Sequence, residues 1–228
     1  MNSNTLELRV CTYNILHGEF VKDNISEIGK DIADMGAVIA GIQEVDMGTS
    51  RVKDANSLSE IAKGAGYEHY TFAKAIDYRG GGYGTAILSK YPIVSAEVMP
   101  LTAEGLEGRA LCHAVIDIDG FKLDFFNTHT SYEAKAPRAK QMLEIAAETA
   151  KCSHFVLTGD FNTDDFSEFE VIAGSKLLNN GQYLSFYQAP SAIDNIVVSD
   201  NISFGESGMP ETKHSDHYPI FTDIKITL

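Results

Sequence analysis

The chain has 228 residues, of which 44% are hydrophobic and 22% are charged. This composition is that of a soluble globular protein, and the length favours a single domain spanning residues 1–228 over two small ones. The formal net charge of −14 disfavours nonspecific binding to nucleic acid, which depends on Lys and Arg, although a local basic site or a bound cation can reverse the field inside one cleft.

The cysteines and the N-terminus bear on location. Cys11, Cys112 and Cys152 are the only cysteines, and an odd, low count without a CxxC pair indicates neither a disulfide framework nor a zinc finger. No basic stretch precedes an apolar run at the start, and no apolar run reaches the roughly 20 residues that span a bilayer. We therefore expect a cytoplasmic protein without a transmembrane segment, although a leader removed before residue 1 would leave no trace.

Hydrophobic periodicity predicts helices and strands in an order that begins with a strand at 6–13, a helix at 24–35 and a strand at 37–43. A second helix is expected near 58–65, and Pro137 is expected to open a third that runs to about residue 151. The remaining predicted strands are 68–75, 84–89, 93–99, 110–118, 121–128, 154–159, 192–198, 202–206 and 218–227. Early helix–strand units followed by many strands indicate sheets with helices outside them.

Several polar residues lie at the ends of these predicted strands. Those that follow strands are Asn14, Glu44, His129, Asp160 and Asn162, and those that open or precede strands are Asp194, Asp216 and His217. Strand ends are rigid positions from which side chains converge on one cleft. Any one of these residues could serve turn chemistry instead, so the hypothesis of a site depends on the whole set in this order.

Part of this set suits a divalent cation. Glu44 and Asp216 offer carboxylate oxygens and Asn14 offers an amide oxygen. Oxygen ligands favour Mg²⁺ or Mn²⁺ over zinc, and the same carboxylates could serve one metal ion or two. A hard cation of this kind is what phosphoester hydrolysis requires.

The rest of the set suits the other demands of that reaction, which are an activated water and stabilisation of charge on phosphate oxygens. Asp160 can position or deprotonate a water molecule. His129 and His217 can donate hydrogen bonds to phosphoryl oxygens, and Asp194 can hold His217 in one tautomer. The residues therefore predict a phosphoester hydrolase.

Short segments along nearly the whole chain resemble the motifs of the endonuclease/exonuclease/phosphatase superfamily, which has the DNase I-like fold. The segments are TYNILHG at 12–18, QEVD at 43–46, YGTAILSKYPI at 83–93, NTHT at 127–130, LTGDFNTD at 157–164, IDNIVVS at 193–199 and SDHYPI at 215–220. The resemblance implies an α/β fold, a four-layer αββα sandwich with two mostly antiparallel central sheets and helices on both outer faces.

The resemblance also implies roles for the matching residues. Asn14, Glu44 and Asp216 would bind Mg²⁺ or Mn²⁺, directly or through water. Asp160 would be the base for water, with Asn162 placing the phosphate. His217 would contact the scissile phosphate and be oriented by Asp194, and His129 would contact the phosphate from the other side. The sequence does not assign an acidic partner to His129, if it has one.

Three further residues are weaker candidates for substrate binding. His17 follows Asn14 closely and could reach the cleft. Arg109 matches a position where bacterial members of the superfamily carry an arginine near the substrate, and Arg51 could face the same cleft from the loop at 46–54. Each has an ordinary structural alternative.

The sequence also narrows the branch of the superfamily. It contains no tryptophan, unlike the basic DNA-repair members, and it lacks the CDR triplet and the basic residues of inositol-polyphosphate phosphatases. It has no insertion comparable to the aromatic membrane-binding one of sphingomyelinase-like members. We therefore expect a phosphodiesterase for a small or lipid-derived substrate, with a nuclease acting on RNA or DNA as the alternative. A non-enzymatic module is disfavoured because all the core residues are present.

Overall fold

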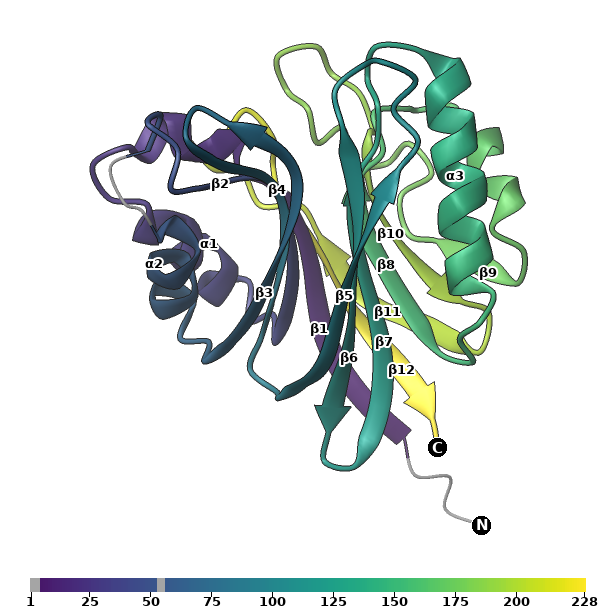
Figure 1. The fold of residues 1–228 in the computed structure, drawn as a ribbon. Helices are drawn as coiled ribbons and strands as arrows, with labels where there is room; N and C mark the ends of the chain where they lie inside the picture. The colour runs from purple at the N-terminus through teal and green to yellow at the C-terminus, as the bar shows by residue number, and fades with distance from the viewer. Residues whose placement is uncertain (1–4, 53–55) are drawn as a thin grey trace.

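The computed structural model describes residues 5–52 and 56–228. Two six-stranded sheets pack face to face, and helices cover the outer face of each (Figure 1). The expected four-layer α/β sandwich with mostly antiparallel sheets is therefore confirmed. Among the described residues, none of the helices has the length and apolar character needed to cross a membrane.

The first sheet has the strand order β11-β12-β1-β2-β4-β3. Its only parallel pair is β1 with β2, because helix α1 (Ser26–Asp34) returns the chain across the outer face between them. Helix α2 (Ser57–Ala65) lies beside α1 on that face. The strands are β1 (Thr5–Asn14), β2 (Ile39–Met47), β3 (His69–Tyr78), β4 (Gly81–Ser89), β11 (Ile202–Gly208) and β12 (Ile220–Thr227).

The second sheet repeats this plan with the order β5-β6-β7-β8-β10-β9. Helix α3 (Lys135–Thr149) connects its parallel pair, β7 and β8, and covers the outer face. Short 3₁₀ helices occur at Leu16–Val21 and Phe166–Val171. The strands are β5 (Ile93–Leu101), β6 (Arg109–Ile118), β7 (Phe121–His129), β8 (Phe155–Asp160), β9 (Ser175–Leu177) and β10 (Asp194–Ser199).

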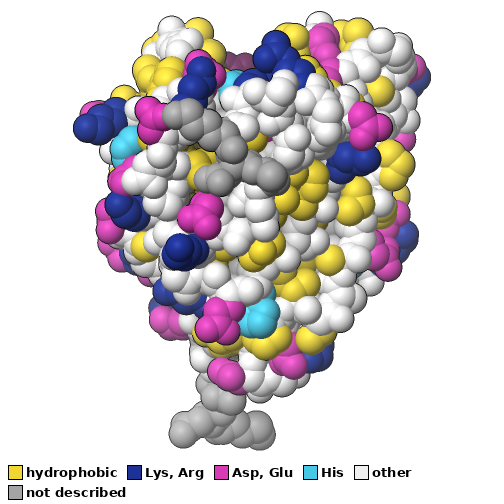
Figure 2. Space-filling view, turned by 60° about the vertical axis from the view of Figure 1, so that its left-hand side comes forward, with side chains coloured by type: hydrophobic (Ala, Val, Ile, Leu, Met, Phe, Trp, Pro, Cys, Tyr) yellow, Lys and Arg dark blue, Asp and Glu magenta, His cyan; other side chains and the backbone are white. Residues whose placement is uncertain are grey.

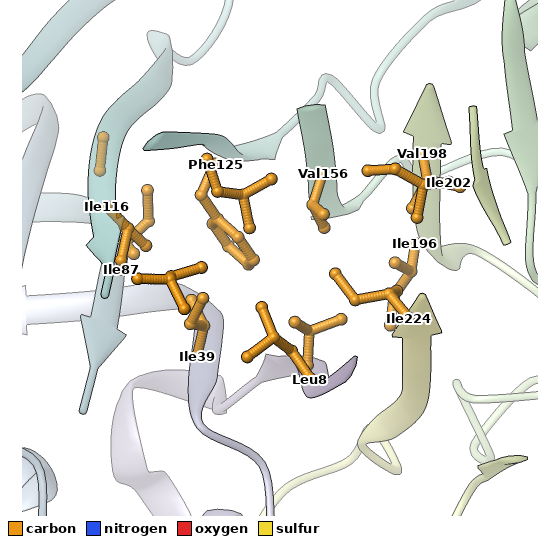
Figure 3. Packing of buried hydrophobic residues seen from close by; sticks show 14 of the residues in the cluster. Leu8, Ile39, Ile87, Ile116, Phe125, Val156, Ile196, Val198, Ile202 and Ile224 are labelled. Atoms are coloured by element: carbon orange, nitrogen blue, oxygen red, sulfur yellow. The ribbon is translucent and has the colours of Figure 1, made fainter. Parts of the chain in front are cut away.

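The buried residues between the sheets are mainly aliphatic, with Phe125 among them. Leu8, Ile39 and Ile224 project from the first sheet toward Phe125 and Val156 of the second, and all are nearly or fully buried (Figure 3). Burying a side chain of this size contributes about 1.5–3 kcal/mol. This apolar layer holds the sheets together over most of their length.

Two differences from the predicted boundaries have a clear physical reason, and one short strand was not predicted. The strand expected to end before Glu44 continues to Met47, because a bulge between Ile42 and Val45 lets Glu44 adopt a φ of 60° without ending the pairing with β4. Helix α3 begins at Lys135, so Pro137 lies within the first turn, where its missing N–H has no intrahelical partner to lose. Strand β9 has only three residues, too few for a periodic signal.

A buried polar network joins the two sheets at one end of the core. Gln43 Nε2 donates to Asn127 Oδ1 at 2.6 Å and to Thr12 Oγ1 at 3.0 Å, and Thr158 Oγ1 donates to the same Asn127 oxygen at 3.0 Å. All four side chains are fully buried. Satisfied networks of this kind fix one alignment, since any slip would leave buried polar groups unpaired.

We expect Gly41→Ala to destabilise the protein. A Cβ at position 41 would lie 1.9 Å from Thr158 Oγ1 and 2.7 Å from Asn127 Oδ1, so the inter-sheet network must shift. Overpacking of this kind lowers the free energy of unfolding by about 1–3 kcal/mol, measurable by urea denaturation. Gly205→Ala, on an exposed part of β11, is the control and should change stability by less. Equal effects of the two substitutions would contradict the close packing of Gly41 against the inter-sheet network.

Candidate active site

A cleft of about 350 Å³ opens at the end of the sandwich opposite the start of β1 and the end of β12, the upper end in Figure 1. In the surface view this end is hollowed between two lobes (Figure 2). The residues that line the cleft are Glu44, Tyr83, Glu107, Arg109, His129, Tyr132, Asp160, Asn162, Phe186, Ile193, Asp216 and His217. They come from both sheets and from the loops above them.

Strand register brings several of the predicted residues together. Asp160 ends β8, where it lies beside His129, the last residue of β7, and opposite Asp194, the first residue of β10. Asn14 ends β1 in the other sheet and reaches across, its Nδ2 donating to Asp160 Oδ2 at 2.9 Å. The predicted convergence of strand ends on one cleft is therefore observed.

Alternation along the strands explains why these side chains point into the cleft. Residues two apart in a strand share a face. Asn14 follows Thr12, His129 follows Asn127 and Asp160 follows Thr158 at this spacing. The site residues are thus the next positions on the same inner faces that carry the buried inter-sheet network.

His217 lies between two carboxylates. Its Nδ1 is 2.7 Å from Asp194 Oδ2, and its Nε2 is 3.8 Å from Asp160 Oδ2. Burial opposes a charged imidazole, but the adjacent Asp194 carboxylate outweighs it and, with Asp160, raises the pKa of His217 to about 10. Ser185 Oγ donates to the same Asp194 oxygen at 2.6 Å. His217 is consequently a charged hydrogen-bond donor that faces the cleft.

Asp160 is a buried carboxylic acid with a strongly raised pKa. It is only 2% exposed, and burial together with the charge of Asp194 raises its pKa to about 7. Asn14 and the backbone N–H of Asn162, which donates to Asp160 Oδ1 at 3.0 Å, hold the carboxylate in place. A carboxylate with a pKa near neutrality accepts a proton readily, which suits a general base.

His129 differs from His217 in charge. Arg109 Nη1 lies 3.2 Å from its Nδ1, and burial together with this guanidinium lowers the pKa of His129 to about 3. Because arginine can only donate, Nδ1 accepts and the ring proton resides on Nε2, which is 3.6 Å from Asp160 Oδ2. The partner of Nδ1 is therefore a cation, itself paired with Glu107 at 3.0 Å, rather than an acid.

Glu44 and Asp216 meet the chemical requirements of a cation site beside Asp160. Burial would raise the pKa of Glu44, but the nearby His17 imidazole, 3.6 Å away, and the hydrogen bond from Asn14 Nδ2 lower it to about 2. Burial and the nearby Glu44 charge raise the pKa of Asp216. A divalent cation would relieve the repulsion among these carboxylates. Asn14 Oδ1 accepts from the Leu16 N–H at 3.1 Å, so its Nδ2 is the atom turned toward Glu44.

The three weaker candidates lie in different places. Arg109 lines the cleft and is 3% exposed. His17 lies 3.6 Å from Glu44 but borders a separate cavity. Arg51 forms an ion pair with Asp46 at 2.7 Å and stacks on Tyr78, so it is not part of the cleft lining.

Sequence patterns missed other members of the site. Ser185 and Phe186 come from the irregular segment before β10, which carries no periodic signal. Phe186 lies with its ring 5.0 Å from that of His217. Glu107, which pairs with Arg109, was visible only as its near neighbour in the chain.

Comparison with known proteins identifies the class. The model of the "Endonuclease/Exonuclease/phosphatase family" matches residues 11–217, and the chain belongs to this family. Members of the family hydrolyse phosphoesters and generally depend on a divalent metal ion, so the chain is a phosphoric ester hydrolase. No curated protein sequence matches it significantly.

Solved structures agree with the fold. An endonuclease/exonuclease/phosphatase from Beutenbergia cavernae has a TM-score of 0.83 and 21% identity over 97% of this chain and 72% of that one. A mannosyl-6-phosphatase from Bacteroides thetaiotaomicron has a TM-score of 0.75 and 18% identity over 95% and 99%. ANGEL2, described as a 2′,3′-cyclic phosphatase, has a TM-score of 0.76 and 14% identity over 100% and 99%.

Replacing Asp194 with Asn tests the origin of the His217 charge. A folded pKa of about 10 exceeds the roughly 6.5 of free histidine, so protonation of His217 contributes stability that is complete below about pH 6.5 and is lost as pH rises through about 10. We expect the pKa of His217 to fall in Asp194→Asn and this stabilisation to shrink.

Imidazole NMR titration and urea unfolding at several pH values measure these two effects. The exposed Asp200→Asn serves as the control and should leave both unchanged. A His217 pKa that is the same in Asp194→Asn and in the unaltered chain would contradict the pairing.

Proposed function

We propose that the chain is a Mg²⁺-dependent phosphodiesterase for a small or lipid-derived substrate. The observation that carries the proposal is the arrangement around Asp160, a buried carboxylate of raised pKa that lies 3.8 Å from the charged His217 and 3.6 Å from the neutral His129. A base flanked by two hydrogen-bond donors is what water attack on a phosphoryl group requires.

In this proposal Asp160 takes a proton from the attacking water. His217, held as an imidazolium by Asp194, donates from Nε2 to a phosphoryl oxygen, and His129 donates from Nε2 to another. The two histidines thereby stabilise negative charge that increases in the transition state. Asn162, whose Nδ2 donates to Thr130 O at 2.9 Å, is positioned beside Asp160 to orient the phosphate.

Glu44 and Asp216 would hold the metal ion, and Asn14, whose Nδ2 is turned toward Glu44 and Asp160, would act through water. When bound, Mg²⁺ or Mn²⁺ supplies a Lewis acid for a phosphoryl oxygen. The all-oxygen character of the available carboxylate donors favours these hard cations. Glu44 is suited to the task because its pKa of about 2 keeps it ionised.

The scarcity of basic side chains in the cleft favours a small substrate over a nucleic acid. Arg109 is the one Lys or Arg among the lining residues that the structure describes, and its guanidinium is shared with Glu107 and His129. A nucleic acid presents a row of phosphates and is usually bound by several basic side chains. Cleavage of RNA or DNA remains the second candidate, since the family includes nucleases.

We expect Asp160→Asn to lower kcat by about 10²–10⁴-fold, because the amide cannot accept the proton of water and general-base catalysis contributes about this much. The measurement uses a bis-aryl phosphodiester, an aryl monophosphate, a phospholipid diester, RNA and plasmid DNA. Exposed Asp164→Asn is the matched control and should retain full activity. Near-normal turnover in Asp160→Asn would remove Asp160 from the mechanism.

The same panel decides the substrate class. Turnover of the small or lipid diester that disappears in Asp160→Asn supports the phosphodiesterase. Cleavage of RNA or DNA at physiological salt that disappears in Asp160→Asn would instead identify the chain as a nuclease.

Removal of divalent cations tests the metal. We expect EDTA to abolish activity and Mg²⁺ or Mn²⁺ to restore it. Glu44→Gln should require a higher Mg²⁺ concentration for half-maximal activity, because one ligand charge is lost. Activity that persists after chelation would rule out metal-assisted hydrolysis.

A further inference from the structure

A second group of potential ligands lies outside the cleft, in the outer layer of the second sheet. His113 of β6, Asp124 of β7 and Cys152, just beyond the C-terminal end of α3, have donor atoms that all lie within 4.8 Å of one another. The residues are far apart in the sequence, and the packing of α3 on the sheet brings them together. None of them lines the acidic cleft.

The geometry of the group is well defined. His113 Nε2 lies 2.8 Å from Asp124 Oδ1. The imidazole stacks on Phe126 with ring centres 4.2 Å apart and an interplanar angle of 11°, which fixes the direction of its nitrogen atoms. Cys152 Sγ also lies near the carbonyl oxygen of Glu148, at 3.9 Å. The side chains are thus held in place before any ion binds.

One imidazole nitrogen, one carboxylate oxygen and one thiol sulfur form a mixed donor set. Zinc accepts these three ligand types in tetrahedral sites at about 2.0–2.3 Å, often with water in the fourth position. Mg²⁺ and Ca²⁺ prefer oxygen alone. All three residues are only partly buried, which leaves a path for the ion and room for a water ligand.

We propose that His113, Asp124 and Cys152 bind zinc at a site separate from the catalytic cleft. Binding converts the thiol to a thiolate, and its proton passes to solvent. Burial and the neighbouring Asp124 carboxylate raise the pKa of Cys152 to about 12, so without the ion this cysteine remains a protonated thiol. The ion would tie the end of α3 to β6 and β7 and stabilise the outer layer.

Cobalt is the probe for this site, since Co²⁺ substitutes for zinc and gives a near-ultraviolet charge-transfer band only when a thiolate is a ligand. We expect the metal-free chain to develop this band with one equivalent of Co²⁺ and to lose it when Zn²⁺ is added. Cys152→Ser should abolish the band, and Asp124→Asn should weaken Co²⁺ binding at least tenfold. The melting temperature should rise with Zn²⁺ in the unaltered chain and not in Cys152→Ser.

Two controls separate this site from other ligands. His154→Ala removes a nearby histidine outside the group, and Cys112→Ala removes a fully buried thiol; both should retain the band. The acidic cleft lining contains no sulfur, so the band does not depend on the proposed hydrolase mechanism. No band with Co²⁺, or a band that survives Cys152→Ser, would overturn the proposal and leave His113 and Asp124 as an ion pair.

Discussion

The hydrogen bond between Gln43 and Asn127 is the constraint on which the site depends. It joins the two sheets directly beneath the cleft, and both side chains are fully buried. Asn127 Nδ2 also donates to the backbone oxygens of Ile42 and Ala86 in the opposite sheet. A shift of one sheet over the other would break these bonds in an apolar interior, where each lost partner is costly. Residues from different sheets can therefore meet with ångström precision.

Within the cleft, two histidines have different charge states, one charged and one neutral. His217 is next to the carboxylate of Asp194, and His129 is next to the guanidinium of Arg109. The first pairing favours the imidazolium and the second favours the neutral ring. Both rings nevertheless direct an Nε2 toward Asp160. One supplies a charged donor and the other a neutral donor on two sides of the same carboxylate.

Excess negative charge is the other organising feature of the cleft. Glu44, Asp160, Asp194 and Asp216 lie around one charged histidine, and two of them have raised pKa values. Such an arrangement is unfavourable by itself and becomes favourable when a cation is bound. On the face shown in Figure 2, by contrast, acidic and basic side chains are interspersed.

The sequence by itself determined the layers and the order of the site motifs. Alternating apolar runs predicted the sheets, and polar residues at strand ends predicted Asp160 and His217, because periodicity is a local property of the chain. Only the tertiary structure decided what surrounds those residues. The backbone conformation of Glu44 depends on a β-bulge, His129 is paired with Arg109 rather than an acid, and Arg51 is paired with Asp46 and does not line the cleft. Each of these outcomes depends on contacts between segments distant in sequence or on the detailed path of a strand or loop, which hydrophobic pattern does not encode.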